Sequence, residues 1–83
     1  MNDAVRLDSL KPGDTCRLHD IKANDATAQR FMDLGLIPGV EIKVVRNAPL
    51  VDPVELLVKN NYVSIRHSEA RRLEEIPLCG RQL

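Results

Sequence analysis

Several short stretches of the chain alternate between apolar and polar positions, the pattern of β-strands that are buried on one face. Val40, Ile42 and Val44, for example, share one face of such a stretch. The alternation breaks between Leu18 and Ile21, which fall on opposite faces, so we expect a β-bulge there. The pattern predicts short strands over residues 7–10, 15–21, 40–46, 54–59, 62–66 and 73–76.

Between the second and third of these stretches the apolar spacing changes to that of a helix. Apolar side chains recur every three residues over 26–34, which predicts an amphipathic helix of about two and a half turns. Asn24 or Asp25 can cap its first turn, and Gly35 stands where a left-handed residue usually ends a helix. The residues expected on its buried stripe are Ala28, Phe31 and Leu34.

Turn-forming pairs separate the predicted elements. Pro12-Gly13 and Pro38-Gly39 combine a preset φ with a residue that tolerates positive φ, and Asn60-Asn61 is a hairpin signal. The order is therefore two short strands, one helix, and three or four further strands. This favours a mainly β fold, a small SH3-like β-barrel of five to six strands with one short α-helix that closes one end. We expect a single domain over residues 1–83, with a flexible tail at 78–83.

Composition narrows the possible functions. The 83 residues carry 12 Lys+Arg and 12 Asp+Glu, a net charge of zero, and only 2% are aromatic. Nucleic-acid-binding domains usually have a basic face or stacking aromatic residues, so no nucleic-acid partner is expected. The polar residues 1–6 argue against a signal peptide, and no apolar run approaches the roughly 20 residues that cross a bilayer. We therefore expect a cytoplasmic protein without direct membrane insertion.

The sequence shows none of the common catalytic motifs. It has no glycine-rich phosphate-binding loop and no His-x-x-x-His pair, and none of its serines lies in a nucleophile motif. Its carboxylates form no recognisable acid–base pair. We therefore expect that the chain is not an enzyme and needs no cofactor.

Metal binding is the main chemical alternative. Cys16-x-x-His19 has a ligand-like spacing, but residues three apart on a regular strand point to opposite faces and would converge only at a bulge. Cys16 is better explained as a small core side chain. His19 and His67 are the candidate ligands for Fe(II) or another divalent transition metal, with Glu69 close to the second histidine in sequence. A surface position at a strand end explains both histidines more simply.

An apolar loop and one helix face are the candidate partner-binding surfaces. Prolines stiffen the loop and so lower the entropy lost on binding; alternatively, its apolar side chains fold back and cap the barrel. The helix face is either a second contact or an ordinary solvated surface. The candidate residues are Pro49, Leu50, Val51, Asp52 and Pro53 of the loop, and Arg30, Met32 and Asp33 of the helix.

A basic cluster lies near the end of the chain, at residues 66–72. Glu69, Glu74 and Glu75 are interleaved with its cations. A cluster of mixed sign is usually solvated surface, so we do not interpret it as a nucleic-acid patch.

Four segments carry motifs that occur together in one known family. The helix runs into Leu34-Gly35-Leu36-Ile37-Pro38-Gly39, and residues 48–54 spell Ala-Pro-Leu-Val-Asp-Pro-Val. Leu7-x-x-Leu10-x-Pro12-Gly13 precedes them, and Ile65-Arg66 with Ser68-Glu69-Ala70 follows. With these motifs in register over residues 7–77, the chain resembles the FeoA family, ferrous iron transport protein A. It departs from the family pattern at Val51, where a glycine is usual.

The resemblance implies an SH3-like β-barrel in the cytosol. The implied partner is the FeoB-type ferrous iron permease, a membrane protein with a cytosolic GTPase domain, and the implied role is an adaptor or regulator of ferrous iron uptake. The alternative is a metal-sensing or metal-carrying module for Fe(II) or another divalent transition metal. An exposed sheet edge also allows a homo-oligomer.

Overall fold

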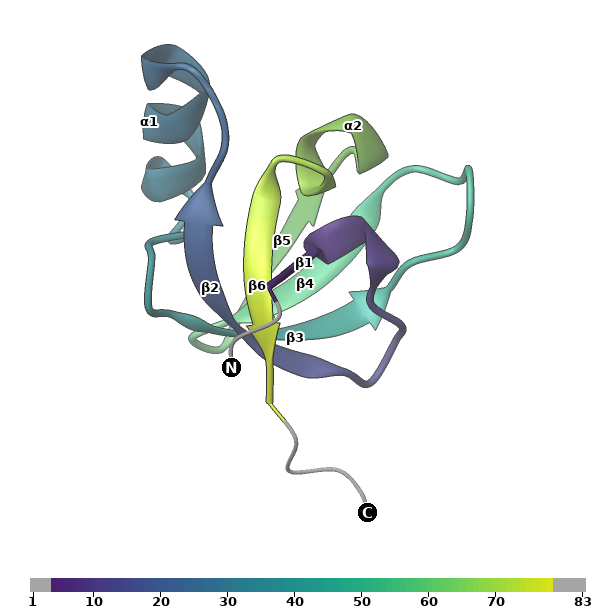
Figure 1. Cartoon of the computed structure of the whole chain (residues 1–83). Coiled ribbons are helices and arrows are strands. Elements are labelled where there is room, and N and C mark those ends of the chain that lie inside the picture. Colours follow the sequence, from purple (N-terminus) through teal and green to yellow (C-terminus); the bar gives the residue numbers. More distant parts are fainter. Residues whose placement is uncertain (1–3, 79–83) are drawn as a thin grey trace.

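A computed structural model describes residues 4–78 of the chain (Figure 1). Six strands, two α-helices and one 3₁₀ turn make up this part. One helix, α1, is nine residues long, whereas α2 is a single turn. The elements are β1 (Val5–Arg6), the 3₁₀ turn η1 (Leu7–Ser9), β2 (Thr15–Ile21), α1 (Asp25–Asp33), β3 (Glu41–Arg46), β4 (Val54–Val58), β5 (Asn61–Ile65), α2 (His67–Ala70) and β6 (Leu73–Pro77).

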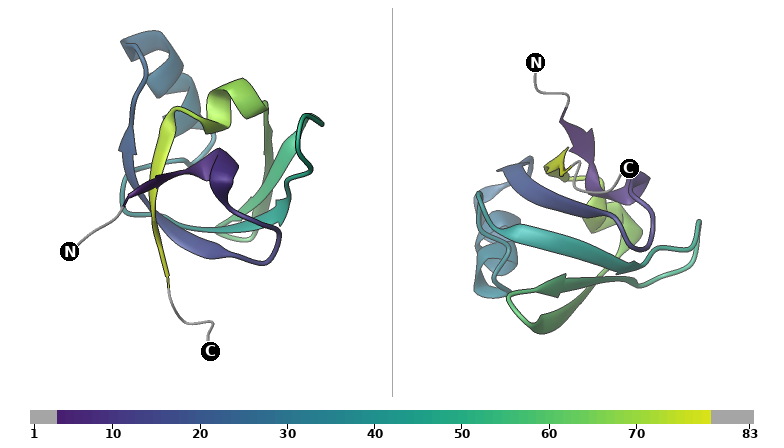
Figure 2. Two further views of the ribbon diagram at one scale, coloured as in Figure 1. Left: turned by 45° about the vertical axis from the view of Figure 1, so that its right-hand side comes forward. Right: turned by 90° about the horizontal axis from the view of Figure 1, so that it is seen from below.

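All six strands belong to one sheet, in the order β1-β6-β2-β3-β4-β5, and every neighbouring pair is antiparallel. The sheet curls around a single core, as the views in Figures 1 and 2 show. The predicted mainly β architecture with one short helix is confirmed. The most deeply buried apolar side chains are Leu7, Cys16, Leu18, Phe31, Leu36, Ile42, Val44, Val54, Leu56, Ala70 and Leu73.

Strand β2 has the bounds that the alternation predicts, and it carries the expected bulge. The register of β2 against β6 shifts between Leu18 and Asp20. Cys16 and Leu18 both point into the core, with exposures of 0% and 1%. A second irregularity lies between Val44 and Arg46, where β3 pairs with β4. Bulges increase local twist, which helps so short a sheet to close on itself.

Helix α1 begins and ends close to where the sequence predicts. The Asn24 side chain accepts a hydrogen bond from the Thr27 N–H at 2.9 Å, and Gly35 adopts φ 92° beyond the last turn. The predicted buried stripe is partly wrong: Phe31 is fully buried, but Leu34 is 38% exposed. The chain reverses at Gly35, so Leu36, fully buried, occupies the core instead.

Two other expectations need correction. Residues 7–10 form no strand: they include η1, and the first strand lies just before it. The hairpin turn is one residue earlier than predicted, because Lys59 and Asn60 adopt φ 49° and 67°. In the predicted tail, Leu78 donates its N–H to the Thr15 carbonyl at 3.0 Å, while Cys79 and the residues after it lie outside the described residues.

Both helices lie at the same end of the barrel, and α2 lies between α1 and the loop that joins β3 to β4 (Figures 1 and 2). Neither α1 nor α2 is long and apolar enough to cross a bilayer. This end of the barrel gathers the candidate residues described next.

Candidate partner-binding surface

The loop between β3 and β4 projects an apolar side chain into solvent. Leu50 is 99% exposed and Val51 is 54% exposed. The alternative in which they fold back to cap the barrel is therefore wrong. Leu50 also has φ 62°, a left-handed conformation that is unfavourable for a residue with a branched side chain.

Contacts with α2, and with η1 and the residue after it, hold this loop in place. His67 Nε2, at the start of α2, lies 3.0 Å from the Ala48 carbonyl oxygen and 2.9 Å from that of Val51. Because both neighbours are acceptors, Nε2 carries the hydrogen and shares it between them. The His67 backbone N–H donates to Asp52 Oδ1 at 2.8 Å.

The near end of the loop is fixed in the same way. Asn47 donates from Nδ2 to the carbonyl oxygens of Asp8 and Leu10, at 3.0 and 2.6 Å. Inside the loop, the Val51 N–H donates to the Ala48 carbonyl at 3.1 Å. The exposed Leu50 side chain is thus carried on a loop whose backbone is tied at both ends.

The three candidate residues of α1 have different environments. Arg30 forms an ion pair with Glu69 of α2, and its guanidinium carbon lies 5.6 Å from the centre of the Phe31 ring. Asp33 accepts a hydrogen bond from Gln29 Nε2 at 3.0 Å. Met32 is 38% exposed. Arg30 is therefore tied to α2, whereas Met32 is a separate exposed apolar side chain.

The structure joins part of the helix face to the base of the loop. A groove of about 370 Å³ is lined by Arg30 of α1 and Pro53 of the loop, together with Ser64, Arg66 and Glu69. The two candidate surfaces are therefore connected through Arg30. Sequence spacing could not show this, because α1 and the loop are about twenty residues apart along the chain.

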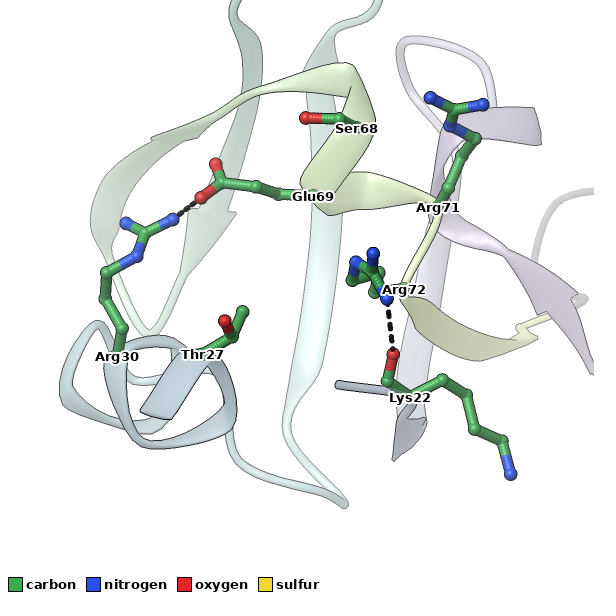
Figure 3. Close-up of a pocket in the computed structure, with 7 residues that line it drawn as sticks. All are labelled: Lys22, Thr27, Arg30, Ser68, Glu69, Arg71 and Arg72. Atoms are coloured by element: carbon green, nitrogen blue, oxygen red, sulfur yellow. Dashed lines mark hydrogen bonds and ion pairs between the residues drawn. The ribbon is translucent and has the colours of Figure 1, made fainter. Parts of the chain in front are cut away.

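A second, larger cleft opens on the other side of the Arg30–Glu69 pair (Figure 3). Its volume is about 610 Å³. One wall holds Lys22 after β2 and Thr27 and Arg30 of α1; the other holds Ser68, Glu69, Arg71 and Arg72 from α2 and the turn after it. The residues of the second wall belong to the mixed-sign basic cluster recognised in the sequence, which gave no indication of a cleft.

Glu75, expected on the surface beside that cluster, is instead inside the barrel. It shares the inner face of β6 with Leu73, two residues earlier, and is 0% exposed. Cys16 Sγ donates to Glu75 Oε1 at 3.2 Å, and Glu75 Oε2 has no partner within residues 4–78. Burial raises the pKa of Glu75 to about 7, and burial together with the Glu75 charge raises the pKa of the Cys16 thiol.

The candidate metal ligands are not brought together. Cys16 is buried, His19 is exposed on the opposite face of β2, and His67 uses Nε2 to hold the loop. The part of the chain that the structure describes contains no group of three or more His, Cys, Asp or Glu side chains placed to hold a metal ion.

These features define a small β-barrel that carries a fixed apolar loop beside a charged cleft at one end. The model of the FeoA domain matches residues 5–74. The chain therefore belongs to the FeoA family, and the predicted SH3-like fold is confirmed by its solved relatives.

Two solved structures and one sequence relative illustrate the relationship. A crystal structure of an iron uptake regulatory protein (FeoA) matches with a TM-score of 0.86 and 26% identity, over 92% of this chain and 100% of that chain. The solution structure of FeoA from Chlorobium tepidum matches with a TM-score of 0.83 and 36% identity, over 94% and 74%. The Fe(2+) transport protein A/Fe(2+) transporter FeoB fusion protein of Porphyromonas gingivalis is 31% identical over 70 residues, which is 84% of this chain but only 8% of that protein.

Proposed function

We propose that this chain is a non-catalytic adaptor or regulator of ferrous iron uptake that binds an FeoB-type ferrous iron permease from the cytosolic side. The observation that carries the proposal is Leu50, 99% exposed and in a left-handed conformation on a loop tied down by His67 and Asn47. Non-glycine residues in such conformations cluster at functional sites, because the surrounding structure must hold them there.

Leu50 contributes little to the core in this position, yet its surroundings fix where it points. Burying an exposed leucine side chain against a partner yields about 2 kcal/mol. Because the loop is already ordered, little conformational entropy is lost on binding. The loop therefore suits docking of Leu50 into an apolar pocket of the permease.

The relative from Porphyromonas gingivalis supports this choice of partner, since its FeoA and FeoB parts belong to one fusion protein. Covalent linkage gives two modules an effective concentration on the order of millimolar. Where the two parts are not linked, the FeoA part must supply that affinity through its own surface. The fixed loop and the adjoining groove are such a surface.

The proposal includes no catalytic step, since the reactive side chains of the barrel have structural roles. His67 holds the loop carbonyls, and Cys16 is buried against Glu75 with its thiol pKa raised. A thiol with a raised pKa is a poor nucleophile at neutral pH.

The test is capture of the detergent-solubilised permease by this protein, with a chelator present throughout. Leu50→Asn keeps a residue that tolerates the left-handed conformation and removes the apolar side chain. We expect it to weaken binding about thirtyfold, the loss equivalent to about 2 kcal/mol. Ile37→Asn, in the turn after α1, is the matched control, because Ile37 is also an exposed apolar residue, at 45%.

The remaining variants test which residues contact the permease. Met32→Glu tests whether the free part of the helix face also contacts the permease. If Leu50→Asn and Met32→Glu both bind like the wild type, the surfaces named here are wrong. If the wild type binds only when Fe(II) is added and the chelator is left out, the metal-dependent module is the better proposal, and His19 and His67 are the next residues to change.

A further inference from the structure

The cleft between α1 and α2 concentrates positive charge in a chain that has none overall. Lys22, Arg30, Arg71 and Arg72 line it with a single carboxylate, Glu69. The formal net charge of the whole chain is zero. The fold therefore separates charges that are balanced along the sequence.

Two of the four cations are already neutralised. Lys22 Nζ lies 3.0 Å from Asp20 Oδ2, and Arg30 is paired with Glu69. Both carboxylate oxygens of Glu69 have partners, because the other oxygen accepts the Arg66 N–H at 2.8 Å. Glu75, next in sequence to this region, is inside the barrel and contributes no surface charge.

Arg71 and Arg72 are left as the free cations of the cleft. Neither forms an ion pair with a carboxylate within residues 4–78. Both side chains are exposed. In Figure 3 their guanidinium groups point in different directions, with the Arg72 group above the Lys22 carbonyl and that of Arg71 away from it.

The backbone that carries these two arginines is fixed. Ala70, immediately before them, is fully buried. The Lys22 N–H donates to the Arg72 carbonyl at 2.7 Å, and Arg72 Nη1 lies 3.5 Å from the Lys22 carbonyl. The two charged groups are thus presented from a rigid support, which reduces the entropy lost when they bind.

The cleft is continuous with the surface proposed above to bind the permease. Arg30 and Glu69 line both the cleft and the groove that reaches Pro53 at the base of the loop. A partner that covers the loop therefore extends naturally toward Arg71 and Arg72.

We propose that the cleft binds an acidic segment of the protein partner, with two carboxylates spaced along an extended chain pairing with Arg71 and Arg72. This inference rests on the proposed function and names the chemistry of the partner segment. Guanidinium groups bind carboxylates through two parallel hydrogen bonds. Complementary charge of this kind raises the association rate and fixes the orientation of a complex.

A compact phosphate fits the cleft less well than an extended acidic segment. Phosphate sites gather donors around one point, whereas the two free guanidinium groups here diverge. Nucleic acid fits poorly for another reason: single strands need exposed stacking residues, and the residues that line the cleft include no aromatic side chain. Thr27 and Ser68 add neutral hydroxyl donors to opposite walls, which suits the backbone and carboxylates of a peptide.

The first test is a titration of ¹⁵N-labelled protein with a hexaglutamate peptide, followed by amide chemical shifts. We expect shifts at residues 22, 27, 30 and 68–72, which weaken as salt is added. Arg71→Glu/Arg72→Glu should abolish them, and Arg71→Gln/Arg72→Gln should weaken binding at least tenfold. Lys43→Glu/Lys59→Glu, the same charge change on another face, should leave binding unchanged. Shifts elsewhere, or tighter binding of pyrophosphate than of the peptide, would overturn the proposal.

The second test uses the permease itself and separates the two proposals. Arg71→Glu/Arg72→Glu should reduce capture at least tenfold while Lys43→Glu/Lys59→Glu does not. If the wild type and Arg71→Glu/Arg72→Glu capture the permease equally, the cleft inference is wrong and the adaptor function stands. If the wild type captures none, the adaptor function is wrong, and the peptide titration alone decides whether the cleft binds acidic segments.

Discussion

Leu50 and Glu75 reverse the usual distribution of side chains, in opposite directions. Leu50 is apolar and 99% exposed, whereas Glu75 is ionisable and 0% exposed. Most domains bury leucine and expose glutamate. The first reversal lies on a loop at the surface, and the second lies inside the barrel, where each position is surrounded by packed neighbours.

The difference lies in what each reversal does to the folded state. Exposing Leu50 leaves the core intact, so we expect a substitution at Leu50 to change binding at the surface and not the packing of the core. Burying Glu75 with one hydrogen bond from Cys16 couples folding to protonation, since the charged form is disfavoured in the interior. Surface and interior can therefore be tested separately, one by binding and the other by stability against pH.

The largest expected effect on stability is at Glu75. Its pKa is raised to about 7 in the folded protein, so the folded state holds a proton that the unfolded state releases above about pH 4.5. Stability contributed by this group is therefore complete below pH 4.5 and is lost as the pH rises to 7, by about 3 kcal/mol in total. Urea unfolding at pH 4.5, 6 and 8 measures this.

Glu75→Gln isolates that effect from every other titrating group. The amide cannot ionise, so the variant should gain stability relative to the wild type as the pH rises through this window, by up to about 3 kcal/mol. Glu74→Gln, the neighbouring residue on the outer face of β6, should leave the pH profile unchanged. Parallel profiles for the wild type and Glu75→Gln would show that the buried carboxyl is not titrating there.

A smaller effect is expected where the loop is tied to α2. His67→Ala removes the donor shared by the Ala48 and Val51 carbonyls and should lower the free energy of unfolding by about 1–2 kcal/mol. Hydrogen exchange at the Val51 amide should become faster, because the turn that it closes loses its support. Ser68→Ala, the next residue of α2, is the control. Unchanged exchange in His67→Ala would mean that the loop holds its shape without the histidine.

The smallest effect is expected at Leu50 itself. Leu50→Asn should change the free energy of unfolding by less than about 1 kcal/mol, because the side chain makes almost no contact with the core. Leu50→Val should be less stable than the wild type by about 1 kcal/mol, since a β-branched side chain fits a positive φ poorly. Thermal unfolding of the three proteins compares them. A large loss in Leu50→Asn would contradict the view that Leu50 serves binding and not folding.

Much of the barrel could be predicted because its strands obey local rules. The alternation in β3 and β4, the bulge in β2 and the glycine after α1 each have one simple structural meaning. The strand predicted over residues 7–10 was wrong, although Leu7 and Leu10 are both buried. Residues three apart lie on the same side of a 3₁₀ turn, so this spacing belongs to η1 and not to a strand.

The surface was predictable only in part. The sequence showed a stiff apolar loop at Pro49, Leu50 and Val51. It did not show that Leu50 would point fully outward, because that depends on His67, sixteen residues after Val51. The cleft depends on contacts that are more distant still, since Lys22 and Arg72 are fifty residues apart. Leu73 and Glu75 are two residues apart on β6 and so share a face, but glutamate is seldom buried, and its position inside the barrel was not predicted.

The pairing of β1 with β6 has a mechanical consequence. Val5 lies opposite Glu75 and Arg6 opposite Glu74, so the chain enters β1 at the same end of the pair at which it leaves β6. Tension applied through both segments would load the hydrogen bonds of this pair one after another, as in opening a zipper, instead of shearing them together. In a longer polypeptide tethered on both sides, the two-residue pairing of β1 with β6 would open before the longer ladders between β2, β3, β4 and β5.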